Sequence, residues 1–225
     1  MSKVKVGIIG ATGYVGVELI RLLNAHPQVE LSAIGSNSFV DKSITEVYPS
    51  VGIGNDMKCM KNEDVIKNSD LIFTALPHGV SEEFVLQAVK EGKKVVDLGA
   101  DFRLKDEATF KEWYNVSFID KKLHEEAVYG LCEHYKDEIK NAKVIANPGC
   151  YVTSISLPLM PLLKEKLIKK EGIVADSKSG VTGAGRGLTL LSHYPEINEN
   201  MVPYKIGNHR HTPEIEQNLT DAAGE

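Results

Sequence analysis

The sequence predicts an α/β fold built on a doubly wound parallel sheet. Short β-branched runs alternate with stretches of helical apolar spacing through residues 1–149, and a cluster of glycines lies at the first junction between them. Such alternation predicts parallel strands joined by crossover helices, with helices on both faces of the sheet. The chain has 225 residues and is 42% hydrophobic, so it is long enough to bury a sizeable core.

The first three elements follow one another closely. Residues 3–10 form a β-branched run that ends in glycine, which predicts a buried strand. Residues 16–27 carry apolar side chains at helical spacing, and we expect Pro27 to end this helix. The apolar run at residues 29–36 predicts the second strand.

The alternation then continues along the chain. Residues 69–79 predict a strand, and residues 81–92 predict a helix with Ser81 as its N-cap. Residues 93–103 and 142–149 predict two further strands. This order of elements is typical of a doubly wound nucleotide-binding domain, which we expect to span residues 1–149.

Charge and cysteine usage narrow the classes of function. The formal net charge is -5, and no Arg-rich stripe is present, so we expect neither nucleic acid nor a membrane as a partner. The three cysteines, Cys59, Cys132 and Cys150, form no C-x-x-C pair, which predicts neither a zinc site nor a disulfide framework. We expect no metal, and a cytoplasmic, reducing location. The N-terminal stretch is too rich in glycine and too short in its apolar run for a signal peptide, so we expect none. No run reaches the roughly 20 apolar residues of a membrane span.

The glycine cluster indicates a cofactor. Gly10, Gly13 and Gly16 recur at intervals of three between the first strand and the first helix. Here a tight turn needs positive φ, and a pyrophosphate needs a close approach to backbone N–H groups at a helix N-terminus. In this context the spacing predicts a dinucleotide site; the alternative is a purely structural turn.

The residues after the second strand bear on the choice of dinucleotide. Enzymes that use NAD place an acid about 20 residues beyond the loop, where it binds the ribose 2′-hydroxyl. This chain has Ser36, Asn37 and Ser38 there, followed by Lys42. Neutral donors and a cation favour NADP, although Lys42 is equally compatible with a solvated loop lysine.

Cys150 follows an Asn-Pro-Gly turn and precedes an apolar stretch, residues 153–167, that we expect to be helical. Free N–H groups at a helix N-terminus stabilise a thiolate and are able to hold an oxyanion. Cysteine is also one of the most commonly buried residues, so the stretch alone leaves a reactive thiol and a core residue equally open.

Two further stretches carry candidate polar groups. His209 and His211 flank Arg210, which favours acid–base work by one histidine and anion binding by the arginine over a metal site or a solvated loop. Residues 176–186 form a Gly/Ser-rich loop that ends in Arg186 and has the donors to bind an anion, or is simply a flexible loop.

Several strings occur together and in order along essentially the whole chain. They are GIIGATGYVGVELIRLL, LPHGVS, DLGADFRL, VYGLCE, NPGCY, SGVTGAGR and HRHTPEIEQ. With them the chain resembles the N-acetyl-γ-glutamyl-phosphate reductases of arginine biosynthesis, whose wider relatives are the aspartate-semialdehyde dehydrogenases. The resemblance implies a Rossmann-type domain over residues 1–149, followed at residues 150–225 by part of an α+β catalytic and dimerisation domain.

The resemblance also implies the chemistry. It is an NADPH-linked reduction of N-acetyl-γ-glutamyl phosphate, a small-molecule substrate, to N-acetylglutamate semialdehyde with release of phosphate. Cys150 matches the nucleophile that forms a thioester. His211 matches the acid–base group, with His209 positioning the substrate or holding the oxyanion, although that order is only a weak preference.

Other residues are assigned to binding. Beyond the three glycines, the cofactor-binding candidates are Ala11, Thr12, Tyr14, Val15, Ser36, Ser38, Lys42, Leu76, Pro77, His78, Ser179, Gly180 and Gly183. The substrate-binding candidates are Arg103, Asn147, Arg186, Arg210 and Glu214. The resemblance also places Tyr204 near the nicotinamide and implies a homo-oligomer for a full-length chain.

The sequence departs from the family pattern in places. Asn37 stands where family members often have arginine, which weakens the case for NADP, and Val152 and Cys132 replace usual prolines. The chain is also shorter than the family, so we expect half of a second domain, with an exposed sheet edge and uncovered apolar surface.

Other functions remain open. One alternative is a nucleotide-binding fragment without activity, and another is a semialdehyde dehydrogenase acting on a different acyl phosphate, against which the histidine string argues. A short-chain alcohol dehydrogenase is disfavoured, because no Tyr-x-x-x-Lys lies at a suitable place.

Overall fold

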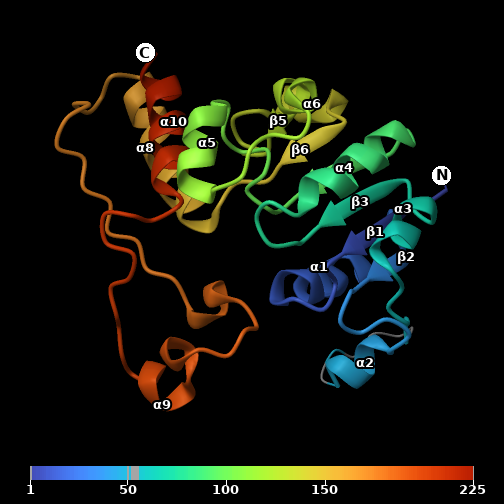
Figure 1. Ribbon diagram of the computed structural model, residues 1–225. Coiled ribbons are helices and arrows are strands. Elements are labelled where there is room, and N and C mark those ends of the chain that lie inside the picture. Colours follow the sequence, from blue (N-terminus) through green and yellow to red (C-terminus); the bar gives the residue numbers. More distant parts are fainter. Residues whose placement is uncertain (1, 50, 52–55, 225) are drawn as a thin grey trace.

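The computed structural model describes residues 2–49, 51 and 56–224, and in them six strands form one parallel sheet (Figure 1). The order across the sheet is β2-β1-β3-β4-β6-β5, and every pair is parallel. The strands are β1 (Val4–Ile9), β2 (Val29–Gly35), β3 (Leu71–Thr74), β4 (Lys94–Asp97), β5 (Val128–Tyr129) and β6 (Val144–Ala146). The predicted doubly wound α/β architecture is confirmed.

Helices cover both faces of the sheet. They are α1 (Tyr14–Asn24), α2 (Ile44–Val47), α3 (Asn62–Lys67), α4 (Ser81–Lys90), α5 (Glu107–Tyr114), α6 (Lys121–Glu126), α7 (Lys136–Asn141), α8 (Cys150–Lys164), α9 (Tyr194–Ile197) and α10 (Thr212–Ala223). Side chains alternate along a strand, so Ile8 packs with α1 and α2 while Ile9 packs with α3 and α4. Two apolar clusters therefore enclose the sheet.

The strand order reverses at two places, and both matter for the site. The chain passes from β2 back across β1 to β3, so the loops that follow β1 and β3 lie side by side. Later β6 inserts between β4 and β5, and Asn147 N donates to Asp97 O at 2.8 Å beyond the paired strands. Ligands of such folds bind outside the carboxyl ends of the strands at these reversals.

Some boundaries differ from the expectation. Helix α1 ends at Asn24, three residues before Pro27. The prediction of Ser81 as N-cap is wrong: Val80 is the N-cap of α4, and the Ser81 main-chain N and hydroxyl both donate to Asp101. The hydroxyl that was expected to accept from the first N–H groups of the helix thus donates instead to the buried carboxylate of Asp101, in the turn after β4.

The short elements were not predicted. Strand β5 has two residues, and α2, α3, α6 and α7 have six or fewer, too few to establish a period.

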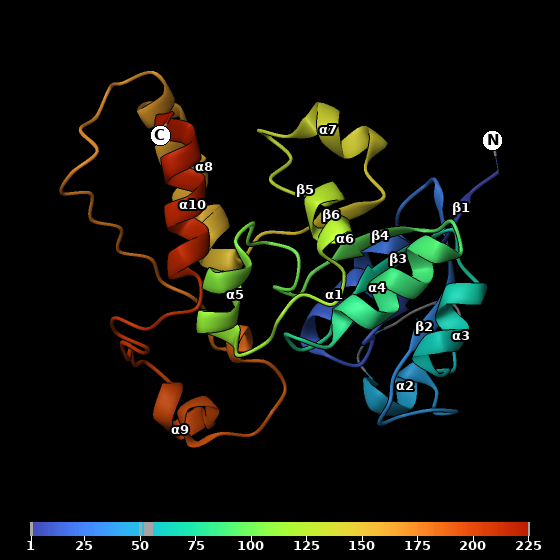
Figure 2. The same cartoon turned by 45° about the horizontal axis from the view of Figure 1, so that its top comes forward.

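The second part of the chain is built on two helices. The predicted helix after Cys150 is confirmed as α8, which packs along α10 in both views (Figures 1 and 2). Between them, the described residues 165–211 form no strand. The chain leaves α8 in an extended path and then forms short helical turns and α9, and Arg186 in this segment contacts the sheet domain. The expected sheet edge is therefore absent from the described residues. The expected uncovered apolar surface is present, with Leu188, Leu190 and Ile206 strongly exposed.

Candidate active site

The glycine loop has the shape of an anion cradle. Gly10 has a φ of +83°, and a Cβ there would lie 2.3 Å from Ala75 O. A Cβ on Gly16 would lie 2.4 Å from Gly10 O. Gly13 is the N-cap of α1, and no side chain of the described residues caps it. The turn is therefore closed by backbone, and the N-terminus of an 11-residue helix is left to face a ligand.

The residues after β2 are tied to this loop. Ser36 is buried and its hydroxyl lies 2.8 Å from the Thr12 hydroxyl. Ser38 is exposed, and the exposed Lys42 ammonium pairs with Glu46 at 3.2 Å. Ser36 is thus held at the loop, whereas Lys42 already has an anionic partner.

The loop after β3 is held rigidly beside the glycines. A methyl carbon of Leu76 would lie 3.3 Å from a Cβ on Gly10. Gly79, which has a φ of +78°, donates its N–H to Asp101 Oδ1 at 2.7 Å. The His78 ring meets Tyr114 edge-on at 5.2 Å, and burial lowers the pKa of this imidazole, with nearby arginines adding to the effect. The predicted cofactor residues 76–78 therefore border the first strand reversal.

Cys150 occupies the expected place. It is the first residue of the 15-residue helix α8, it is exposed, and it follows directly on the strand that lies next to β4. Gly149 is the N-cap, and no described side chain caps it. The thiol thus lies at an open helix N-terminus at the carboxyl edge of the sheet, where a thiolate and an oxyanion are stabilised.

His211 lies against the same turn. A Cβ on Gly149 would be 2.5 Å from His211 Nε2, so the imidazole packs on the Cα of the residue before Cys150. Burial lowers the pKa of His211 to about 4, and the charges of Arg103 and His209 contribute. The ring is therefore neutral at physiological pH and able to accept a proton. Its Nδ1 is buried with no partner among the described residues.

Two tyrosines and two histidines gather next to Cys150. The rings of His209 and His211 are 4.9 Å apart, and Tyr151 lies 5.3 Å from His209. The Tyr204 hydroxyl lies 3.2 Å from His209 Nε2, and burial, with Tyr151 and Cys150 nearby, raises the pKa of this phenol. The structure therefore brings both predicted histidines and Tyr204 to the thiol.

A buried polar network supports the turn from behind. Glu214 is 1% exposed; its Oε1 accepts from Gly149 N at 3.1 Å and from the Tyr129 hydroxyl at 2.6 Å. Its Oε2 pairs with Arg103 at 3.5 Å, and Arg103 Nε donates to Asn147 O at 2.7 Å. In this structure these three residues, Glu214, Arg103 and Asn147, bind one another and neighbouring residues of the chain. The substrate contacts expected of them remain predictions.

Sequence reasoning missed two of these supports. Tyr129 and Asp101 each bind backbone or side-chain groups of the site loops, Tyr129 from β5 and Asp101 from the turn after β4. Asp101 falls inside the string DLGADFRL and Tyr129 inside the string VYGLCE. Their places in these motifs could have marked both residues.

The remaining arginines lie apart. Arg210 is exposed near the histidines, with its guanidinium carbon 5.7 Å from the Tyr114 ring centroid. Arg186 instead lies on the cofactor loop, where Nη1 donates to Thr12 O at 3.2 Å. Ser179, Gly180 and Gly183 are exposed around the turn Val181–Ala184. The loop that carries them is anchored to the sheet domain through Arg186.

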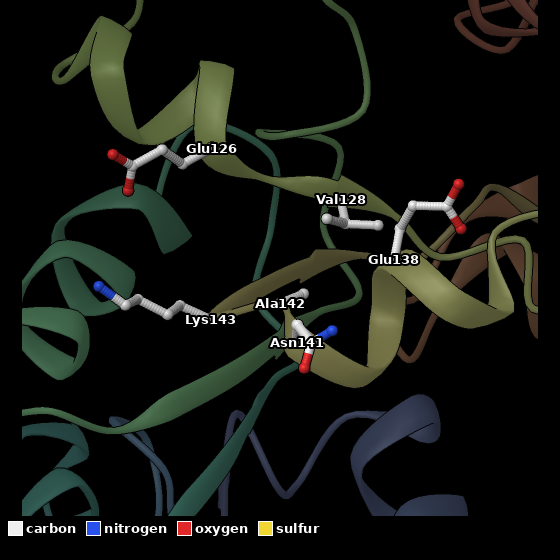
Figure 3. A pocket seen from close by; sticks show the side chains of 6 residues that line it. All are labelled: Glu126, Val128, Glu138, Asn141, Ala142 and Lys143. Atoms are coloured by element: carbon white, nitrogen blue, oxygen red, sulfur yellow. The ribbon is translucent and has the colours of Figure 1, made fainter.

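A hollow of about 290 Å³ lies elsewhere, at the amino ends of β5 and β6. It is lined by Glu126, Val128, Glu138, Asn141, Ala142 and Lys143. In Figure 3 the side chains of Glu126 and Lys143 extend to one side of the hollow, and that of Glu138 extends to the other. Since the ligand edge of a parallel sheet is the carboxyl edge, this hollow does not belong to the candidate active site.

Among the described residues, no helix is long and apolar enough to cross a membrane. No group of three or more histidine, cysteine or acidic side chains among them has the arrangement to hold a metal ion.

A parallel sheet with a glycine turn opening on a free helix N-terminus defines a dinucleotide-binding α/β protein. Family models support a narrower class: the semialdehyde dehydrogenase NAD binding domain matches residues 5–142, and the semialdehyde dehydrogenase dimerisation domain matches residues 150–225. The chain belongs to the semialdehyde dehydrogenase family.

Two relatives are similar to this chain over nearly its whole length. N-acetyl-gamma-glutamyl-phosphate reductase of Clostridium beijerinckii is 53% identical over 98% of this chain, and that of Pelotomaculum thermopropionicum is 51% identical over 99%. The chain spans 64% and 65% of their lengths.

Solved structures share the fold. Aspartate semialdehyde dehydrogenase of Candida albicans, solved with NADP, superposes with a TM-score of 0.62 at 18% identity, covering 97% of this chain and 60% of that one. Aspartate semialdehyde dehydrogenase II of Vibrio cholerae gives a TM-score of 0.51 at 18% identity, covering 73% of this chain and 46% of that one.

Proposed function

We propose that this chain carries out the NADPH-dependent reduction of N-acetyl-γ-glutamyl phosphate to N-acetylglutamate semialdehyde, with release of phosphate. The observation that carries the proposal is the exposed Cys150 thiol at an open helix N-terminus, with the neutral imidazole of His211 against the preceding glycine. The relatives at 51–53% identity bear the name of this reductase.

The cradle residues fit a dinucleotide. Gly10, Gly13 and Gly16 leave no Cβ in the turn, and the first turn of α1 presents uncapped N–H groups for a pyrophosphate. Ala11, Thr12, Tyr14, Val15, Ser36, Ser38 and residues 76–78 would surround the rest, with Ser179, Gly180 and Gly183 approaching from the opposite loop. When bound, NADPH supplies the hydride.

The side chains of this chain perform the group transfer. His211 accepts the thiol proton, and the Cys150 thiolate attacks the acyl carbon, forming a C–S bond as the C–O bond to phosphate breaks. The proton held by His211 then passes to the departing phosphate. N–H groups at the start of α8 hold the negative charge that develops on the acyl oxygen. After hydride reaches the thioester carbon, the C–S bond breaks, which releases the aldehyde and restores the thiolate.

Substrate anions need positive groups nearby. Arg210 is exposed beside the histidines and faces no carboxylate partner among the described residues, so we assign it to the substrate phosphate or carboxylate. His209, held by Tyr204, would position the acyl oxygen.

The organisation of the whole protein follows the same proposal. Residues 1–149 would form the NADP-binding domain, and residues 150–225 would form part of the catalytic and dimerisation domain of a homo-oligomer. Three cysteines without a disulfide among the described residues fit a reducing compartment, the cytoplasm.

The test follows the reverse reaction on this chain by the absorbance of NADPH. N-acetylglutamate semialdehyde and NADP⁺ should give NADPH only when phosphate is present. Cys150→Ser should abolish this signal while dinucleotide binding persists, and Cys132→Ser, which changes another exposed cysteine, should leave it intact. Activity retained in Cys150→Ser would remove the covalent mechanism.

Two outcomes would support the alternatives. Dinucleotide binding without any phosphate-dependent signal would favour an inactive nucleotide-binding fragment. A larger signal with aspartate semialdehyde than with the acetylated substrate would favour a dehydrogenase for another acyl phosphate.

A further inference from the structure

The guanidinium of Arg186 is docked on the nucleotide-binding half of the molecule. Its carbon lies 4.6 Å from the centroid of Tyr48 and 5.3 Å from that of Phe39. Its Nη1 donates to Thr12 O at 3.2 Å, and the Tyr48 hydroxyl donates to the same oxygen at 2.9 Å. A residue 174 positions away in sequence therefore forms one wall of the glycine loop.

This position corresponds to the ribose end of a dinucleotide site. In doubly wound folds the group on the adenosine ribose is read at the end of the second strand, by an acid for a 2′-hydroxyl and by an arginine for a 2′-phosphate. Here β2 ends at Gly35, Ser36 binds Thr12, and Phe39 follows three residues later. Arg186 contacts Thr12, the partner of Ser36, and also Phe39.

The local loop does not provide a free cation. Lys42 pairs with Glu46, and the Asn37 amide oxygen accepts from Asn62 at 3.1 Å. Arg186 forms no ion pair with any carboxylate in the described part of the chain and is exposed. A guanidinium has five N–H donors in a planar fork, so donors remain after the bond to Thr12 O.

We propose that Arg186 binds the 2′-phosphate of the dinucleotide and that this contact sets the preference for NADP over NAD. The inference rests on the proposed function, because it needs a dinucleotide in the glycine cradle. Phe39 and Tyr48 hold the planar guanidinium by stacking and cation–π attraction, and Thr12 O orients it. The 2′-phosphate is then recognised from the second half of the chain, rather than from the loop that usually carries the cation.

The test is the binding of four probes by calorimetry at one fixed ionic strength, because contacts between exposed charges are screened by salt. The probes are NADP⁺, NAD⁺, 2′,5′-ADP and 5′-AMP. Arg186→Ala should weaken the binding of NADP⁺ and 2′,5′-ADP by about 10- to 100-fold, the range for a lost charge-assisted contact. The affinities for NAD⁺ and 5′-AMP should stay within about threefold of wild type, which also shows that the variant is folded.

Two further variants sharpen the result. Lys178→Ala removes an exposed cation from the same loop, one that pairs with Asp176, and should change none of the four affinities. Arg186→Lys keeps the charge but loses the planar fork of donors. Its affinity for NADP⁺ and 2′,5′-ADP should lie between those of wild type and Arg186→Ala.

Each contrary outcome has a distinct meaning. Equal weakening of NADP⁺ and NAD⁺ by Arg186→Ala, or no weakening of either, overturns the assignment of the 2′-phosphate while the proposed function stands. Failure of the wild-type chain to bind any of the four probes overturns both.

Discussion

The contact between the proposed base and the proposed nucleophile's turn depends on a residue without a side chain. Gly149 lies between Pro148 and Cys150. The imidazole of His211 packs against its Cα, in the space that a Cβ would otherwise occupy. Its backbone is not in the left-handed region, with a φ of -65°, so the requirement for glycine comes from space alone. The turn therefore brings the proposed base next to the proposed nucleophile.

Gly149→Ala should displace His211 and lower kcat by about 100-fold, because a shift of about 1 Å at a catalytic group costs that much. The control is Gly187→Ala, since nothing lies within 4 Å of a Cβ there. Steady-state kinetics measure kcat for both variants, and circular dichroism shows whether each variant is folded. Unchanged kcat in Gly149→Ala would mean that the contact with His211 has no role in the reaction.

At the scale of elements, the site depends on how α10 meets the start of α8. Glu214 in the first turn of α10 accepts the N–H of Gly149 and pairs with Arg103, which follows β4. One buried carboxylate thus joins three segments that are distant in sequence. Buried ion pairs of this kind hold geometry more than they add stability, and removing one partner leaves the other charge uncompensated.

Glu214→Gln keeps an acceptor for Gly149 N–H but removes the charge opposite Arg103. We expect a loss of about 1–3 kcal/mol in the free energy of unfolding, measured by urea denaturation. Glu216→Gln changes an exposed glutamate of the same helix and should stay within about 0.5 kcal/mol of wild type. Equal stability of the two variants would argue that the Arg103 pair is dispensable.

For the whole molecule, a buried acid couples stability to pH. Asp97 ends β4 and is fully buried; its Oδ1 accepts from the Thr74 hydroxyl at 2.6 Å and from Gly99 N at 3.2 Å. Burial raises the pKa of Asp97 to about 6, with Asp101 adding to it and these hydrogen bonds opposing it. The folded state therefore favours the protonated acid more than the unfolded state does. The stabilisation is fully present below the unfolded pKa near 3.8 and is lost as pH rises through about 6.

Asp97→Asn keeps an acceptor for Thr74 and Gly99 and cannot ionise. We expect the stability of this variant relative to wild type to increase by about 1–3 kcal/mol between pH 4 and pH 7, in the direction set by the raised pKa. Urea denaturation at several pH values measures the difference, with Asp70→Asn, an exposed aspartate before β3, run alongside as a reference. A difference that does not change with pH would show that Asp97 is ionised throughout.

The local pattern of the sequence was sufficient to predict the sheet, the first turn and the position of Cys150. Strand and helix periodicity predicted the doubly wound sheet, the glycine spacing predicted the turn before α1, and the Asn-Pro-Gly turn placed Cys150 at the start of a helix. Each of these depends on residues close together in the chain, whose conformational preferences act locally. The resemblance assigned His209 and His211 to the reaction of the thiol, and those roles stay predictions; in the structure His211 packs on Gly149 and His209 lies beside Tyr151.

Tertiary structure alone decided how these parts meet. The insertion of β6 between β4 and β5, the burial of Glu214 with Arg103, and the docking of Arg186 on Tyr48 join residues more than 100 positions apart or depend on the order of strands. No local preference specifies such contacts, because they arise from which surfaces become buried together when the sheet closes and the helices pack. For that reason Arg103, Glu214 and Arg186 were recognised as important in the sequence, but their partners became visible only in the fold.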